Sequence, residues 1–175
     1  MASTEHPGAQ VRAALDAAGV AYEVMDCDPE LADTAAFCAH YDVPVEQSAN
    51  TILVAGKPRG GGEKTYVACV VLAHTRLDVN GAVRRRLDVK KASFASADET
   101  RELTGMLIGG VTAAALPDGM PLWVDARVMD AEWIVLGGGD RSTKIKAAPS
   151  ILTALGAEVV PDLATLPDPA PASGG

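Results

Sequence analysis

The stretch ASADETRELTGMLIGGVTAAAL, residues 95–116, joins a charged helical segment to an apolar loop that contains glycine. Ser96 and Glu99 have the spacing of a capping box, so the sequence predicts a helix that begins after Ser96 and ends near Thr104. Gly105 follows as the residue that most easily takes the left-handed conformation with which such a helix ends. This part of the chain therefore predicts a short, well-delimited helix that leads into a loop.

The loop itself has an unusual composition for a surface connection. Met106, Leu107 and Ile108 are apolar, and Gly109 and Gly110 come directly after them. Apolar side chains favour burial of the loop, and two glycines allow a ligand to approach the bare backbone. Backbone N–H groups in such a turn can donate to a carboxyl, ester or phosphate oxygen. The other interpretation is an ordinary crossing between two core elements, and spacing alone favours it.

Outward from this stretch, hydrophobic periodicity and turn residues predict a mixture of helices and strands. Further helices are expected at 11–18, 33–41 with Asp33 as N-cap, 77–87 and 149–155. Strands are expected at 21–27, 50–55, 65–73, 91–94, 122–125, 133–136, 143–147 and 157–160, of which 50–55 and 65–73 form a hairpin. Because regular βαβ alternation is missing, the predicted class is α+β.

The domain organisation follows from length and composition. A chain of 175 residues fits one domain, which we expect to span 11–160. Residues 1–10 are expected to be a flexible N-terminus, and residues 161–175, rich in Pro, Ala and Asp, a disordered tail.

Composition also limits the location and the cofactors of the protein. Hydrophobic residues make up 48% of the chain, but no apolar run reaches the roughly 20 residues that span a bilayer. The three cysteines, Cys27, Cys38 and Cys69, have no metal-binding spacing, so we expect reduced thiols in a cytoplasmic protein. No metal or other cofactor is expected, and no membrane partner.

The formal net charge of −8 disfavours sequence-independent binding to duplex DNA. It leaves room for one local basic patch that recognises the end of an RNA. The candidates lie together in the sequence at Arg76, Arg84, Arg85, Arg86, Lys90 and Lys91. The alternative is a solvated helix end whose basic residues favour the C-terminal dipole.

Three landmarks in a fixed order resemble the YbaK/EbsC family, which includes editing domains associated with prolyl-tRNA synthetase. They are NTILV at 50–54, SADETRELTGMLIGGV at 96–111 and WIVLGGGDR at 133–141, with RLDVNGAVRRRL at 76–87 between the first two. The resemblance extends from about residue 11 to about residue 160. It implies a single domain with a twisted, partly barrel-like mixed β-sheet flanked by helices.

The resemblance also implies a set of site residues. The family's hallmark lysine, just before the first strand of the hairpin, is replaced here by Asn50, whose amide is neutral. Where the family commonly has an acidic residue this chain has Lys144, which could restore the lost positive charge or be a surface lysine. His74 is a further candidate because an imidazole titrates near neutral pH. We therefore assign catalytic roles to Asn50, His74 and Lys144.

Binding roles complete this set. The substrate is expected to contact the glycine loop and the third landmark, at Met106, Leu107, Ile108, Gly109, Gly110, Gly137 and Gly138. The tRNA is expected to contact Arg76, Arg84, Arg85 and Lys90. Two further departures from the family are Ala113, where proline is usual, and Gly137, where serine is common.

The function that the resemblance implies is aminoacyl-tRNA editing: hydrolysis of the ester that joins a wrong, small amino acid to the 3′ end of a tRNA. The expected partners are an aminoacylated tRNA 3′ end and, as a second candidate, a synthetase. One alternative is a catalytically degenerate module that binds an aminoacyl ester, a nucleotide or a protein. Another is hydrolysis of a different small ester or amide in the same pocket.

Overall fold

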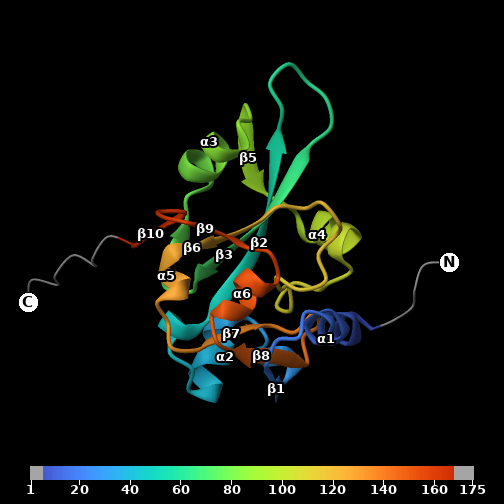
Figure 1. The fold of residues 1–175 in the computed structure, drawn as a ribbon, viewed down its shortest axis with the longest axis vertical. Coiled ribbons are helices and arrows are strands. Elements are labelled where there is room, and N and C mark those ends of the chain that lie inside the picture. Colours follow the sequence, from blue (N-terminus) through green and yellow to red (C-terminus); the bar gives the residue numbers. More distant parts are fainter. Residues whose placement is uncertain (1–5, 168–175) are drawn as a thin grey trace, which may run out of the picture.

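A long antiparallel hairpin organises the computed structural model, which describes residues 6–167. Strands β2 (Ala49–Lys57) and β3 (Thr65–Leu72) pair from Ala49 opposite Leu72 to Gly56 opposite Thr65. β-Branched residues are frequent in both strands, as is usual for strands packed on both faces. The hairpin rises to the top of the molecule in Figure 1.

The hairpin belongs to a mixed sheet of five strands in the order β5-β2-β3-β6-β9. Its other members are β5 (Lys91–Phe94), β6 (Leu122–Asp125) and β9 (Glu158–Val160). β3, β6 and β9 run parallel, and the other pairs are antiparallel. In the described part of the chain the sheet ends at β5 and β9 and closes no barrel.

Two smaller sheets complete the strand pairing. One has the order β1-β8-β7, and in it Met25 lies opposite Lys144. Its strands are β1 (Glu23–Asp26), β7 (Ile134–Gly137) and β8 (Thr143–Ala147). The other pairs β4 (Arg76–Leu77) with β10 (Ala164–Thr165). The first of these lies at the bottom of Figure 1, at the end opposite the hairpin tip.

Six α-helices surround the sheets. They are α1 (Pro7–Ala17), α2 (Thr34–Tyr41), α3 (Arg84–Leu87), α4 (Ala97–Thr104), α5 (Ala126–Met129) and α6 (Ser150–Ala154). Short 3₁₀ turns occupy Pro29–Leu31 and Val45–Gln47, and a π turn occupies Val79–Val83. Within residues 6–167, no helix is long and apolar enough to span a bilayer. The α+β class with a mixed sheet flanked by helices is confirmed.

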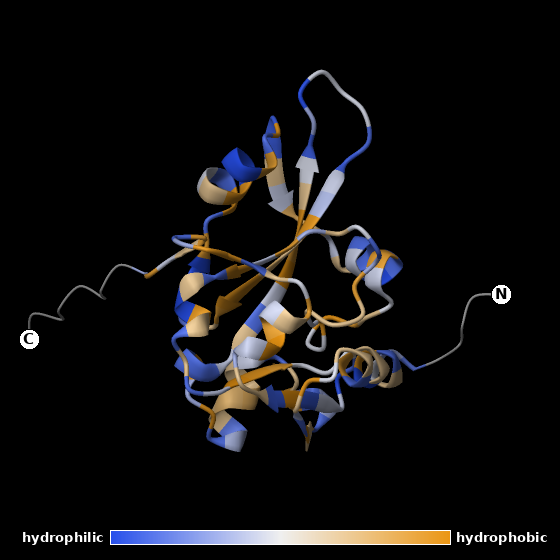
Figure 2. Ribbon diagram, viewed as in Figure 1, coloured by the Kyte–Doolittle hydropathy of each residue, from blue (hydrophilic) through white to orange (hydrophobic). Residues whose placement is uncertain are grey.

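Hydrophobic residues fill both faces of the central sheet. One cluster includes Leu53, Val70 and Val124, and the other includes Val54, Val71 and Trp123. Figure 2 shows this as hydrophobic colour along the central strands and hydrophilic colour on much of α3. A third cluster surrounds Phe37 on α2.

Several predicted boundaries were wrong at the two ends of the chain. Helix α1 begins at Pro7, so residues 7–10, which we expected to be flexible, are helical. Proline is favoured in the first turn because its φ is already helical. At the other end, Leu163 is fully buried and β10 follows it, within the segment expected to be disordered. The rest of the two expected flexible segments, 1–5 and 168–175, lies outside the described residues.

The helix predicted at 77–87 is divided into three elements. β4 pairs with β10, the π turn follows, and only Arg84–Leu87 is α-helical. The side chain of Asp78 accepts hydrogen bonds from the backbone N–H groups of Gly81 and Ala82, at 3.1 and 3.0 Å. This local bonding starts the helical segment after Asp78 and frees the two preceding residues for strand pairing.

The helix that opened the sequence analysis has the predicted ends. Ser96 Oγ accepts from the Glu99 N–H at 3.0 Å, and Gly105 ends α4 with φ 72°. In a full capping box the Glu99 side chain would also accept from the backbone N–H of Ser96. Here the Glu99 carboxylate instead pairs with Lys64 at 3.0 Å. α4 is thereby connected to the hairpin loop.

Candidate functional site

A cavity of about 240 Å³ lies where the exposed edge of β2 meets α2, β7, β8 and the loop after α4. β2 pairs with β5 only from Val54 onward, so the same edge of residues 49–53 has no strand partner within its sheet. Eleven residues line the cavity: Asp33, Thr34, Ala49, Asn50, Thr51, Ile52, Ile108, Gly109, Val111, Gly137 and Lys144. Five of the predicted site residues are therefore brought together there: Asn50, Ile108, Gly109, Gly137 and Lys144.

Asn50 is oriented by a neighbour on α2. The Thr34 hydroxyl donates a hydrogen bond to Oδ1 of Asn50 at 2.9 Å. The carboxamide Nδ2 of Asn50 has no hydrogen-bond partner among the described residues. Asn50 therefore presents a neutral donor at the wall of the cavity.

Lys144 is a buried cation beside the same cavity, with 7% of its surface exposed. Its Nζ donates to the carbonyl oxygens of Ala32 at 2.8 Å and Gly109 at 2.6 Å, and lies 5.2 Å from the centre of the Phe37 ring. Burial lowers the pKa of the Lys144 ammonium, because desolvation disfavours the charged form. An ammonium has three N–H donors, so one remains after these two carbonyl bonds.

The glycine loop is held by two cations on two consecutive carbonyls. Arg141 donates to the Ile108 carbonyl at 2.8 Å, while Lys144 holds the Gly109 carbonyl. Because every described peptide bond is trans, the N–H of Gly109 points away from the Arg141 guanidinium. No backbone or side-chain acceptor within residues 6–167 takes this N–H, whereas the Gly110 N–H donates to Leu107 O at 2.8 Å.

Two glycines of the loop are needed for different reasons. Gly109 has φ 91°, and a Cβ there would overlap the Arg141 guanidinium. A Cβ on Gly110 would overlap the backbone of Asp140, and one on Gly137 would overlap the Val111 carbonyl. Gly110 therefore permits close packing of the loop inside the protein. Of the two loop glycines, Gly109 and Gly110, only Gly109 lines the cavity.

Three other predicted substrate contacts lie elsewhere. Met106 is 1% exposed in the core, and its N–H donates to Thr104 Oγ1 at 3.1 Å. Leu107 is exposed but does not line the cavity, and its N–H donates to Gly139 O at 3.3 Å. Gly138 packs against Thr143. The apolar side of the cavity is formed by Ile108 together with Ile52 and Val111, which sequence reasoning had not selected.

His74 does not line the cavity, contrary to the sequence-based expectation. It follows β3, in the turn closed by the hydrogen bond from Thr75 N to Leu72 O. Its Nδ1 is buried and has no hydrogen-bond partner. His74 comes directly after the central strand β3, but this position does not bring its imidazole to the unpaired edge of β2.

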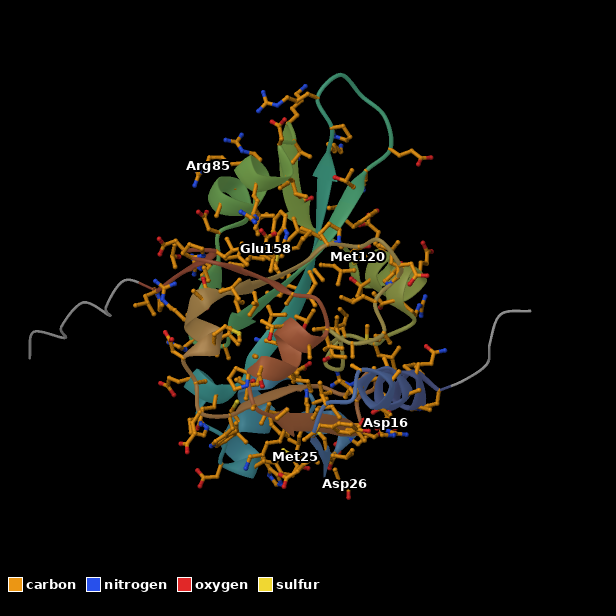
Figure 3. All side chains as sticks on the ribbon, in the orientation of Figure 1. Asp16, Met25, Asp26, Arg85, Met120 and Glu158 are labelled. Carbon is orange, nitrogen blue, oxygen red and sulfur yellow. The ribbon has the colours of Figure 1, made fainter. Side chains whose placement is uncertain are left out.

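The predicted tRNA contacts also lie away from the cavity. Figure 3 shows Arg85 on α3 at the other end of the molecule from Met25, the cross-strand partner of Lys144. Arg84 is on the same short helix and Arg76 is on β4, whereas Lys90 lines a separate groove at the hairpin tip. None of these four residues lines the cavity.

Sequence reasoning missed three polar residues at the site. Asp33 makes no side-chain cap to α2; its carboxylate lies 3.2 Å from the Arg141 guanidinium and lines the cavity. Arg141 also donates to Pro29 O at 3.0 Å. Thr51 is 8% exposed, and its Oγ1 is buried without a hydrogen-bond partner. The sequence did single out Asp33, but as the N-cap of the helix expected at 33–41, and that interpretation left no reason to place it in a site.

The three cysteines are unpaired and buried. Within residues 6–167, no group of three His, Cys, Asp or Glu side chains is placed to hold a metal ion.

Comparisons with known proteins agree with this geometry. The crystal structure of a protein proposed as a trans-editing enzyme for prolyl tRNA synthetase superposes with a TM-score of 0.77 at 24% identity, covering 93% of this chain and 99% of that one. The crystal structure of a hypothetical protein, APE2540, superposes with a TM-score of 0.76 at 25% identity, covering 89% and 99%. The model of the aminoacyl-tRNA editing domain family matches residues 28–154, which include every residue that lines the cavity. This chain belongs to the aminoacyl-tRNA editing domain family.

Proposed function

We propose that the cavity beside β2 hydrolyses the ester that links a small amino acid to the 3′ end of a mischarged tRNA. The observation that carries this proposal is that Gly109 lines the cavity and that its N–H, turned away from Arg141, has no acceptor within residues 6–167. Family membership supports the reaction class. The ester carbonyl oxygen would accept from this N–H.

The reaction needs a water molecule, an oxyanion donor and a proton path. Water adds to the ester carbonyl carbon, and the negative charge that develops on the carbonyl oxygen is stabilised by the Gly109 N–H and the Asn50 amide. The bond from the carbonyl carbon to the ribose oxygen then breaks, and a proton passes to that oxygen. The products are the free amino acid and the tRNA with its terminal ribose hydroxyl restored.

The base for the attacking water comes from the substrate in this proposal. Among the described residues, no histidine or cysteine lines the cavity. The neighbouring hydroxyl of the terminal ribose is close to the ester in any binding mode, so it can orient the water. Catalysis then depends mainly on positioning and on preorganised donors.

Asp33 is suited to recognise the amino group of the ester. Only its Oδ1 contacts Arg141, so Oδ2 can accept a charge-assisted hydrogen bond from an α-ammonium group. This contact would distinguish an aminoacyl ester from an ordinary acyl ester.

The size of the cavity favours a small amino acid. Its volume of about 240 Å³ is below the roughly 300–1,000 Å³ of pockets that enclose drug-sized ligands. Part of that volume has to hold the ester and the ribose edge. The rest of the cavity is bounded by the apolar side chains of Ile52, Ile108 and Val111.

A deacylation panel tests the proposal. The purified chain is incubated with one tRNA carrying in turn alanine, serine, cysteine, proline or phenylalanine, and release of the labelled amino acid is followed; a proline tRNA is the first choice because of the structural relative. We expect hydrolysis of at least one of the small amino acids well above the uncatalysed rate, with phenylalanine hardly affected. The proposal would be overturned if folded protein left every aminoacyl-tRNA of the panel hydrolysing at its uncatalysed rate.

One alternative has an observation in its favour. Asn50 replaces a cation, so the cavity could bind an aminoacyl ester without hydrolysing it. An amide-linked aminoacyl-adenosine separates the two cases: saturable binding without turnover of any ester indicates a binding module, whereas binding and turnover together indicate an enzyme.

A further inference from the structure

We propose that a track along β5 and the unpaired start of β2, from the hairpin tip to the cavity, holds the single-stranded 3′ end of an RNA, with Phe94 as a stacking platform. This inference rests on the proposed function, since it names how the substrate reaches the cavity. It goes beyond the expected contacts at Arg76, Arg84 and Arg85.

The first observation is a basic groove at the hairpin tip. A groove of about 540 Å³ is lined by Lys57, Pro58, Gly60, Gly61, Gly62, Lys64 and Lys90. The backbone N–H of Lys90 donates to Lys57 O at 2.9 Å, which fixes the two lysines beside each other. In a chain of net charge −8, three lysines in one groove form a pronounced local positive field.

The charges of this groove are only partly balanced within the protein. Lys57 lies directly opposite Lys91 across the β2–β5 ladder, and like charges in that position are destabilising. Two other cations of the loop are paired with acidic side chains, Arg59 with Asp88 and Lys64 with Glu99. Within residues 6–167, Lys57, Lys90 and Lys91 have no such partner. An external anion would relieve their repulsion.

The second observation is an exposed aromatic ring between this groove and the cavity. The chain has two phenylalanines: Phe37 is 1% exposed, whereas Phe94 is 60% exposed. Phe94 pairs with Val54, so the two side chains share a face of the sheet. Ile52 follows on that face two residues earlier in β2, and it lines the cavity. Phe94 is therefore one diagonal step from the cavity wall.

These features are in the order that an RNA 3′ end requires. Along β2 the lysine groove lies at Lys57, the aromatic platform at Val54 and the cavity at Asn50. At about 3.3 Å per strand residue, Asn50 and Lys57 are about 23 Å apart. At about 3.4 Å per nucleotide along one strand, this corresponds to about seven nucleotides.

The chemistry of the track fits single-stranded RNA. Proteins hold single strands by combining a positively charged groove for phosphates with aromatic rings on which bases stack. Here phosphates would lie on Lys57, Lys90 and Lys91, and a base near the 3′ end would stack on Phe94. The terminal aminoacyl ester would then enter the cavity.

The test measures binding of uncharged RNA, so it does not depend on hydrolysis. A stem-loop with a seven-nucleotide single-stranded 3′ end and the same stem-loop with a blunt end are titrated by fluorescence anisotropy. The variants are Phe94→Ala, Phe94→Trp and the double variant Lys57→Ala/Lys91→Ala. The matched controls are Val159→Ala, an exposed apolar position on β9, and Arg101→Ala, an exposed cation on α4.

We expect the wild-type protein to prefer the overhang, and Phe94→Ala to weaken that binding about tenfold while Phe94→Trp and both controls stay within about twofold. The double lysine variant should reduce the slope of log K against log salt by about 1.4. Equal binding of blunt and overhanging RNA, or unchanged affinity in Phe94→Ala, would overturn the inference. An inactive protein that still binds the overhang through Phe94 would contradict the proposed function alone.

Discussion

Two cations, Arg141 and Lys144, give the glycine loop its direction. Arg141 donates a hydrogen bond to the carbonyl of Ile108, and Lys144 donates one to the carbonyl of the next residue, Gly109. A planar trans peptide ties the direction of each carbonyl to that of the next N–H. The Gly110 N–H is consequently turned back to Leu107, and the Gly109 N–H has no acceptor within residues 6–167.

Replacing Arg141 by methionine tests this arrangement. The substitution removes the hold on the Ile108 carbonyl but keeps the aliphatic stem, so the Gly109 N–H loses its fixed direction. We expect kcat for deacylation to fall about tenfold to hundredfold, because loss of one oxyanion donor costs about 10²–10³ in kcat. Arg101→Met on α4 is the control, and equal kcat values for the two variants would contradict this role.

A second residue-scale prediction concerns Cys69 in the centre of β3. Burial raises the pKa of its thiol from 9.0 to about 12. The unfolded chain therefore loses this proton above pH 9 while the folded protein keeps it. Stability should fall between these two pH values, by up to about 1.4 kcal/mol per pH unit.

The measurement compares urea unfolding of the wild type and Cys69→Ala under reducing conditions from pH 8 to 11. The variant is expected to be less stable at pH 8 because of the lost side-chain volume, and the difference should shrink above pH 9. A difference that stays constant across this range would argue against a buried, protonated thiol.

Among the elements, those with strong local signals were predicted from the sequence. Helix α4 has a serine cap and a terminal glycine, and the hairpin has two runs of β-branched residues, so local chemistry and tertiary packing agree. The helix expected at 77–87 failed because Arg76–Leu77 pairs with β10, which is 87 residues away in the chain. No local pattern reveals such a partner.

The candidate site was predicted in part for a similar reason. Asn50 and Gly109 lie in landmarks that resemble the family, Lys144 lies just after the third one, and the cavity unites them. His74 was chosen for its chemistry, but the hairpin register places it on the other side of β2. Asp33 was missed because an aspartate before a helix is usually a cap, whereas here it faces Arg141.

The last described segment of the chain carries an element-scale prediction. Leu163 is fully buried, and the next residue, Ala164, donates its N–H to Asp125 Oδ2 at 2.7 Å. We expect Leu163→Ala to reduce the free energy of unfolding by about 2–5 kcal/mol. Leu166→Ala, at a position 57% exposed, should change it by less than about 0.5 kcal/mol. Urea unfolding of both variants measures this, and similar stabilities would show that the segment does not hold the fold.

In the whole molecule, charge and cavity are at opposite ends of one strand. β2 begins at the cavity and ends beside the lysine groove, so a single rigid element sets the distance between them. The acidic remainder of the chain disfavours broad binding to nucleic acid, whereas the lysines at the hairpin tip form a local positive field. This distribution suits a protein that accepts one end of an RNA.

The most direct test of the central claim observes the Gly109 N–H itself. In an ¹⁵N-labelled sample, an amide-linked aminoacyl-adenosine is titrated and the amide resonances of Gly109, Gly110 and the hairpin residue Gly62 are followed. We predict that the Gly109 resonance moves downfield and saturates with binding, while Gly62 stays unchanged and Gly110 keeps the slow hydrogen exchange of a bonded amide. Binding that moves other cavity resonances but leaves Gly109 in place would contradict the account.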